Sequence, residues 1–99
     1  MNNNEVFKEI GFTDRETKVY LALIELGLTT VGPIATKTML QNSKVYETIN
    51  KLVAKGLVSF IVISKTKHFQ ASDPKELLNL MDERKQKLSE VITNLRLKQ

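Results

Sequence analysis

The spacing of hydrophobic residues changes at Gly56. Before this glycine, apolar residues recur at intervals of three and four, which places their side chains on one face of an α-helix. After it, residues 57–63 are rich in valine, isoleucine and phenylalanine, which favour a β-strand. Residues 64–66 predict a polar hairpin tip, and residues 67–71 can return as the second strand. The tip has no glycine or asparagine, so the turn type stays open.

Three helices are predicted ahead of this hairpin. Thr13 and Glu16 have the spacing of a capping box, and Gly27 suits a left-handed position after the end of a helix. Pro33 suits the first position of a second, short helix, because its missing N–H costs nothing there. Residues 40–42 then make a turn. The three helices are expected over residues 14–26, 33–39 and 42–55.

One long helix is predicted after the hairpin. Asp73, Pro74 and Glu76 supply a cap, a proline at the first position and a glutamate at the third. The apolar residues that follow alternate steps of four and three, as in a coiled coil, except where Arg84 interrupts. This seam consists of Leu77, Met81, Leu88, Val91 and Leu95. The helix is longer than the rest of the chain can cover, so we expect it to pair in a homodimer; alternatively, it folds back on its own domain.

Composition excludes several classes of protein. The chain has 99 residues, 41% of them hydrophobic and 26% charged, which indicates one globular domain. It has no cysteine and one histidine and lacks nucleophile and phosphate-loop motifs, so we expect no metal, no cofactor and no enzymatic activity. The polar start of the chain does not resemble a signal peptide, and no apolar run has membrane-spanning length. We therefore expect a cytoplasmic protein with no membrane partner.

The positive charge is concentrated in the middle third of the chain. The net charge is +4, and the excess comes from residues 41–70, where Glu47 alone opposes the lysines Lys44, Lys51, Lys55, Lys65 and Lys67. Such a patch suits a polyanion, because each lysine near a phosphate releases a condensed counterion. The alternative is an ordinary solvated, lysine-rich surface.

The helix over residues 42–55 has one apolar and one polar face. Val45, Ile49 and Leu52 are expected to face the core. The opposite face carries Ser43, Glu47, Asn50, Lys51 and Ala54, with Lys44 at its flank. A helix with small polar side chains can enter a DNA major groove, where asparagine pairs with adenine and glutamate accepts from cytosine. The preceding short helix and turn favour recognition over an ordinary solvated face.

The hairpin tip carries Lys65, Lys67 and His68. We expect them to contact phosphate or the minor groove, although a charged edge that prevents aggregation explains them equally well. Tyr46 lies between core and surface, so its hydroxyl either donates to a phosphate or stays hydrated.

Two segments resemble the TrmB-type archaeal transcriptional regulators: residues 10–23 (IGFTDRETKVYLAL) and residues 43–47 (SKVYE), the latter followed by Leu52 and by KGLV. The resemblance covers about residues 10–75 and implies a winged helix-turn-helix DNA-binding domain, with Ser43, Lys44 and Tyr46 near the DNA. The sequence departs from the family in the turn, which lacks the usual glycine and proline, and at Asn42, where a basic residue is common. Longer members carry a sugar-sensing domain; we expect a stand-alone short form without an effector domain.

The predicted fold class is α+β and mostly α: a winged helix-turn-helix, with a three-helix core and a β-hairpin wing, followed by a long C-terminal coiled-coil helix. Residues 1–73 are expected to bind double-stranded DNA and residues 74–99 to dimerise. We expect a homodimeric transcriptional regulator; the alternatives are a protein–protein interaction module and a sequence-independent architectural DNA-binding protein. The predicted DNA-binding residues are Asn42, Ser43, Lys44, Tyr46, Glu47, Asn50, Lys51, Lys65, Lys67 and His68.

Overall fold

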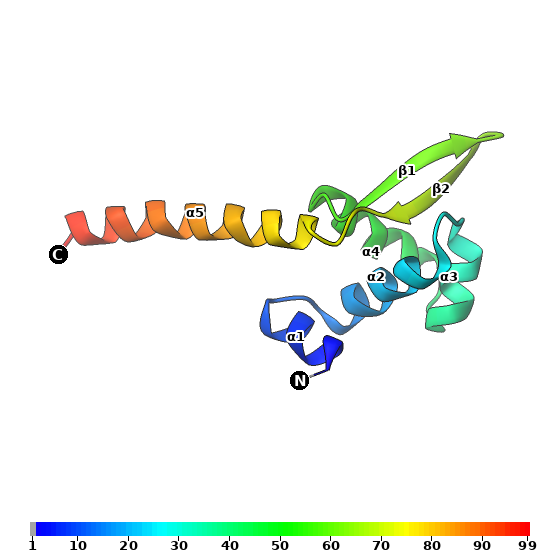
Figure 1. Cartoon of the computed structure of the whole chain (residues 1–99), viewed down its shortest axis with the longest axis horizontal. Helices are drawn as coiled ribbons and strands as arrows, with labels where there is room; N and C mark the ends of the chain where they lie inside the picture. Colours follow the sequence, from blue (N-terminus) through cyan, green and yellow to red (C-terminus); the bar gives the residue numbers. More distant parts are fainter. Residues whose placement is uncertain (1) are drawn as a thin grey trace.

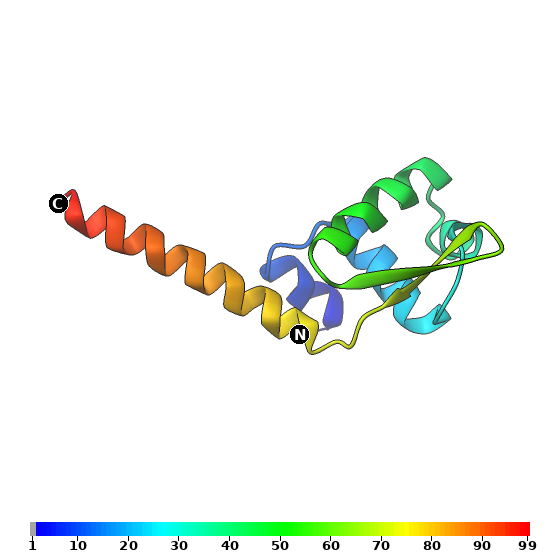
Figure 2. The same cartoon turned by 90° about the horizontal axis from the view of Figure 1, so that it is seen from above.

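The computed structural model describes residues 2–99. The first four helices and a two-stranded hairpin form a body, from which a long last helix extends to one side (Figures 1 and 2). The molecule is therefore elongated, with extents of 56 × 32 × 24 Å. The expected winged helix-turn-helix architecture is confirmed. Its elements are α1 (Asn3–Glu9), α2 (Asp14–Leu26), α3 (Val31–Thr38), α4 (Asn42–Ala54), β1 (Val58–Ile63), β2 (Thr66–Ala71) and α5 (Glu76–Leu97).

One core lies between α2, α3, α4 and the base of the hairpin. The apolar faces predicted for α2 and α4 supply its centre, because each helix buries the stripe repeated at three and four residues. Phe69 of β2 closes the core on the side of the hairpin. The fully buried side chains are Val19, Tyr20, Leu23, Ile34, Val45, Ile49, Leu52 and Leu57.

Helix α2 begins as the sequence predicts but ends in a different backbone conformation from the expected one. The capping box is complete: the Glu16 N–H donates to Thr13 Oγ1, and the Thr13 N–H donates to Glu16 Oε1, each over 3.0 Å. Gly27 has φ 73° but ψ −149°, which is not the left-handed helical conformation expected for it. Essentially only glycine adopts this backbone conformation. It directs the chain towards Thr29, which forms an isolated antiparallel β-bridge with Phe69 of β2.

Helix α3 begins two residues before the predicted start. Thr30 is its N-cap residue and Val31 its first helical residue, so Pro33 occupies the third position and not the first. The proline is tolerated there for the expected reason, since the first four N–H groups of a helix have no partner within it. The helix ends at Thr38, and Met39 turns the chain with a left-handed backbone, φ 60° and ψ 29°.

Helix α5 begins later than predicted, at Glu76 and not at Pro74. The Asp73 carboxylate accepts from the Lys75 N–H over 2.9 Å, so it closes a turn ahead of the helix. The Glu76 N–H then donates to the Asp73 carbonyl over 2.8 Å. The predicted cap and proline therefore build the turn that leads into the helix.

The hairpin is antiparallel, and its register runs from Val58 paired with Ala71 to Ile63 paired with Thr66. Thr66 therefore belongs to the second strand, and the tip is two residues long instead of three. Ser64 and Lys65 both have positive φ, 49° and 67°. Positive φ at both loop residues characterises the turn that fits the right-handed twist of a hairpin.

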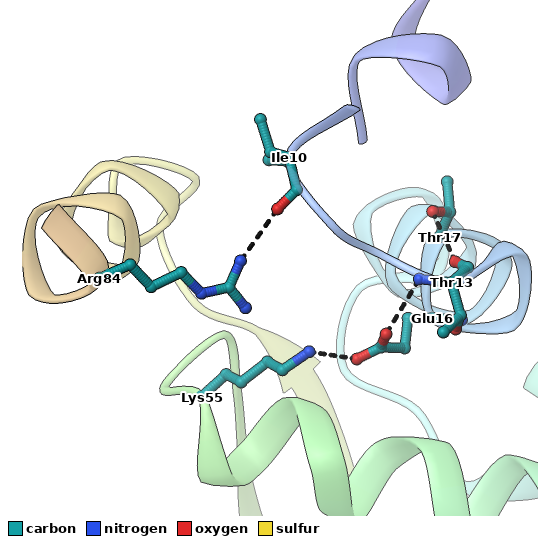
Figure 3. Close-up of polar contacts among 6 residues, drawn as sticks. All are labelled: Ile10, Thr13, Glu16, Thr17, Lys55 and Arg84. Atoms are coloured by element: carbon teal, nitrogen blue, oxygen red, sulfur yellow. Dashed lines mark hydrogen bonds and ion pairs between the residues drawn. The ribbon is translucent and has the colours of Figure 1, made fainter. Parts of the chain in front are cut away.

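Arg84 anchors the first half of α5 to the body. Its Nη1 donates to the Ile10 carbonyl over 2.9 Å, in the turn after α1 (Figure 3). Leu80 is buried beside this contact, and Leu77 and Met81 pack against the core. The residue that interrupts the apolar spacing thus marks the end of the docked part. Residues 85–99 are all exposed, and this part of α5 extends away from the body (Figures 1 and 2).

Replacing Met39 with glycine is expected to stabilise the fold. The side chain is 92% exposed and loses no packing, while a left-handed backbone costs an L-residue about 1 kcal/mol. The free energy of unfolding, measured by urea denaturation, should rise by about 0.5 kcal/mol or more. Lys18→Gly, at an exposed position inside α2, is the control and should lower it by up to about 1 kcal/mol. A Met39→Gly variant as destabilised as this control would contradict the argument.

Candidate nucleic-acid interface

The exposed face of α4 follows from its buried face. Val45, Ile49 and Leu52 are completely buried, so the helix cannot rotate about its axis without exposing them. Thr48, also buried, donates its hydroxyl to the Lys44 carbonyl over 2.7 Å and so satisfies its only polar group. The predicted contact residues all lie on the exposed side: Asn42, Ser43, Lys44, Tyr46, Glu47, Asn50 and Lys51.

Charges on this face are only loosely paired. Lys44 Nζ lies 3.6 Å from Glu47 Oε2, and both side chains are about half exposed. A pair of this kind contributes less than about 1 kcal/mol, because water screens it and both side chains lose freedom. Lys44 can therefore exchange Glu47 for a phosphate at little cost.

The hairpin brings its three predicted contact residues to one end of the molecule, in different environments. Lys65 is exposed within the turn. Lys67 Nζ lies 4.4 Å from the centroid of the Phe60 ring, a cation–π contact. His68 is half-buried, with Nδ1 3.1 Å from the Thr66 carbonyl, an acceptor to which only a protonated nitrogen can donate.

The N-terminal half of α4 and the tip of the hairpin lie towards the same end of the molecule, opposite the C-terminus of α5 (Figure 2). This arrangement brings Lys44 of the helix and Lys65 of the tip to one end, although 20 residues of chain separate them. A rod-shaped polyanion at this end can contact both elements at once. The sequence alone does not show that the two elements lie together.

Lys55 is separate from the basic patch in which the sequence analysis placed it. Its ammonium group pairs with the buried Glu16 carboxylate and lies 5.0 Å from the centroid of the Phe12 ring (Figure 3). The contact joins the end of α4 to the start of α2. Lys55 thus helps to position α4. The lysines left exposed on α4 and the hairpin are Lys44, Lys51, Lys65 and Lys67.

Burial alone would raise the pKa of the Glu16 carboxyl, but the hydrogen bonds from Lys55 and from the Thr13 N–H outweigh it and hold that pKa below its ordinary value of 4.5. The ionised carboxylate is therefore the form that the fold stabilises. A second perturbed group lies nearby in α2, where burial and the negative charge of Asp73 raise the pKa of Tyr20.

Comparison of the sequence with protein families matches residues 7–75 to the model of the sugar-specific transcriptional regulator TrmB. The chain belongs to the TrmB family. It is also 34% identical, over 77 residues, to the uncharacterised protein YrhO of Bacillus subtilis (strain 168). That match covers 78% of this chain but only 28% of YrhO, so the chain spans less than a third of the length of this relative.

Transcriptional regulators and a chromatin protein are among the solved structures with a similar fold. TrmBL2, an archaeal chromatin protein, is similar over 93% of this chain and 37% of its own, with a TM-score of 0.83 and 19% identity. A possible transcriptional regulator from Methanosarcina mazei Go1 is similar over 94% of this chain and 83% of its own, with a TM-score of 0.73 and 11% identity. A MarR family regulator from Silicibacter pomeroyi covers 93% of this chain with 68% of its own, at a TM-score of 0.63 and 15% identity.

Residues 2–99 contain no candidate for two other kinds of site. No helix in this range has the combination of length and apolarity that crossing a bilayer requires. Within the same residues, no three side chains of the histidine, cysteine, aspartate and glutamate types are grouped as metal ligands would be.

The sequence does not reveal two features that the structure shows. In the sequence, Arg84 only interrupts an apolar spacing, and the fold shows that its guanidinium donates to the Ile10 carbonyl. The sequence also predicts β1 as a strand without indicating that its apolar side chains are exposed. One signal for this exposure is that residues 60–63 are apolar without a break, whereas a strand with one buried face alternates.

Glu16→Gln is expected to destabilise the protein by about 1–3 kcal/mol at pH 7, because it leaves the Lys55 ammonium without its buried partner. The pKa of Glu16 is lowered by folding, so its contribution is complete above pH 4.5 and is lost as the pH falls through the folded pKa. The stability difference from the wild type should therefore shrink in acid, as measured by denaturation at pH 7 and pH 3.

The matched control is Glu25→Gln. Glu25 pairs with Lys37 over 2.6 Å, but this pair is exposed to water. Its loss should change the free energy of unfolding by less than about 1 kcal/mol at either pH. Equal effects of the two substitutions at pH 7 would contradict a special role for the Glu16–Lys55 pair.

Proposed function

We propose that this chain binds double-stranded DNA as a homodimeric transcriptional regulator, with α4 in the major groove and the hairpin on the adjacent backbone or minor groove. The observation that carries the proposal is the polar face of α4, held outward by its buried stripe at the same end as the hairpin. Membership of the TrmB family supports it independently.

Helix α4 has the dimensions and side chains that a major groove accepts. The groove is about 12 Å wide and admits one helix. Ser43 and Lys44 lie in the first turn, where the free N–H groups of the helix add their own attraction for phosphate. Asn50 and Glu47 have the donors and acceptors to contact adenine and cytosine edges. Lys51 is placed to contact backbone.

The second half of α5 supports dimerisation. Beyond Arg84, an apolar face continues through Leu88, Val91 and Leu95, and the structure adds Ile92, which lies between them on the same side of the helix. All four side chains are exposed in the single chain. Two such helices can bury these faces against each other, which would set two copies of α4 at a fixed separation along DNA.

An architectural role is the second candidate, favoured by the structural similarity to a chromatin protein. Both roles use the same phosphate contacts, and they differ in the contribution of the base edges. A protein-interaction module is a third alternative, which Glu47 on the exposed face of α4 leaves open.

DNA affinity is expected to fall as salt rises from about 50 to 200 mM, because binding releases counterions from phosphates. Lys44→Ala, Lys51→Ala and Lys65→Ala should each reduce the slope of log affinity against log salt by about 1.8, because a dimer loses two phosphate contacts at about 0.9 each. Lys98→Ala, at the far end of α5, is the control and should leave the slope unchanged. Fluorescence anisotropy with a labelled duplex, repeated at several salt concentrations, measures the affinity and the slope.

A flat salt response, with all three substitutions silent, would reject the DNA interface. The duplex for this experiment comes from selection of bound sequences from a random pool. Competition between the selected and random duplexes then separates the two DNA-binding roles, since a regulator prefers the selected duplex and an architectural protein binds both equally.

Leu88→Asp is expected to raise the dimer dissociation constant at least about tenfold, because it would bury an unpaired carboxylate between the helices. Gln86→Asp adds the same charge to the opposite face of α5 and should change it little. Sedimentation velocity over a range of concentrations measures both. A wild-type chain that remains monomeric at high concentration would contradict the dimer.

A further inference from the structure

Strand β1 exposes four consecutive apolar side chains. The exposed fractions are 42% for Phe60, 46% for Ile61, 60% for Val62 and 43% for Ile63. The strand is also the outer strand of the hairpin, since Thr29 bridges to β2 on the other side. An exposed apolar row on a projecting edge strand favours aggregation and does not stabilise the fold. Such a row therefore indicates a surface that binds a partner.

The four residues divide between the two faces of the hairpin. Phe60 and Val62 share the face of the buried Phe69. The rings of Phe60 and Phe69 are 6.0 Å apart, and Lys67 lies over Phe60, so the chain itself partly covers this face. Ile61 and Ile63 point to the opposite face.

The side chains around this second face suit a nucleic acid. Ile61 is paired with His68, and Ile63 with Thr66. Lys65 of the turn follows Ile63 directly, whereas Lys67 is paired with Val62 and so lies on the first face, over Phe60. The apolar ridge of Ile61 and Ile63 therefore ends at a cation. This order matches DNA, where the apolar edges of the sugars adjoin the charged phosphates.

We propose that Ile61 and Ile63 form an apolar ridge that enters the DNA minor groove and widens it. The inference rests on the proposed function, because a duplex held by α4 passes the hairpin at the same end of the molecule (Figure 2). The minor groove of B-DNA is about 6 Å wide, too narrow for a two-stranded ribbon. Entry of the ridge therefore opens the groove and bends the duplex towards the major groove.

The test is the double substitution Ile61→Thr with Ile63→Thr. Threonine is also β-branched, so it keeps the strand propensity and removes apolar surface. Val62→Thr, on the other face of the same strand, is the matched control. Affinity is measured for the selected duplex at several salt concentrations, and bending by energy transfer between dyes at its two ends.

We expect the double variant to bind about tenfold more weakly, with a smaller bend and an unchanged salt slope, because it loses apolar contacts and no phosphate contact. Val62→Thr should bind and bend DNA like the wild type. Lys65→Ala should show the opposite signature, a lower salt slope. If circular dichroism shows the double variant unfolded, Ile63→Thr alone carries the test, with about threefold weaker binding expected.

Three results would overturn the inference. Unchanged affinity and bending in the double variant would leave the proposed function intact and remove the ridge from it. A reduced salt slope would show that the isoleucines act only by placing the lysines. Wild-type association beyond a dimer without DNA, abolished by the double substitution, would show that β1 edges pair between copies. If the wild-type chain binds no duplex, the proposed function itself is rejected, and this outcome is distinct from the three above.

Discussion

The rest of the structure depends on the burial of one apolar stripe, Val45, Ile49 and Leu52 of α4. Burying each of these side chains contributes about 1.5–3 kcal/mol, and all three are completely buried. A rotation by one residue, about 100°, would carry a polar neighbour into the core. This cost sets the direction in which the opposite side chains point, and so the stripe defines the candidate interface without belonging to it.

The two ends of α4 are held by different means. At its start, a left-handed Met39 turns the chain sharply from α3. At its end, Lys55 pairs with Glu16, which also completes the capping box of α2. Breaking a buried pair is costly because one charge stays buried without a partner, although forming the pair adds little net stability. Glu16 therefore contributes mainly to the geometry of the two helices.

Arg84 divides α5 into two parts with different surroundings. The turns before it pack on the core through Leu77, Leu80 and Met81. Those after it extend from the body with an exposed apolar face. Because Arg84 donates to the carbonyl of Ile10, the direction of the free part is linked to the turn between α1 and α2. In the proposed dimer, this contact would help to set the separation of the two copies of α4.

The sequence by itself determined what local rules govern: the capping box of Thr13 and Glu16, the apolar period of α4, and the change to a hairpin after Gly56. It placed the predicted contact residues of α4 correctly on an exposed face, because a helical period assigns faces without reference to other elements. Only the tertiary structure decided that Lys55 is paired with Glu16, that Arg84 is an anchor, and that Ile61 and Ile63 stay exposed. These outcomes depend on which surfaces distant segments cover, and no local pattern carries that information.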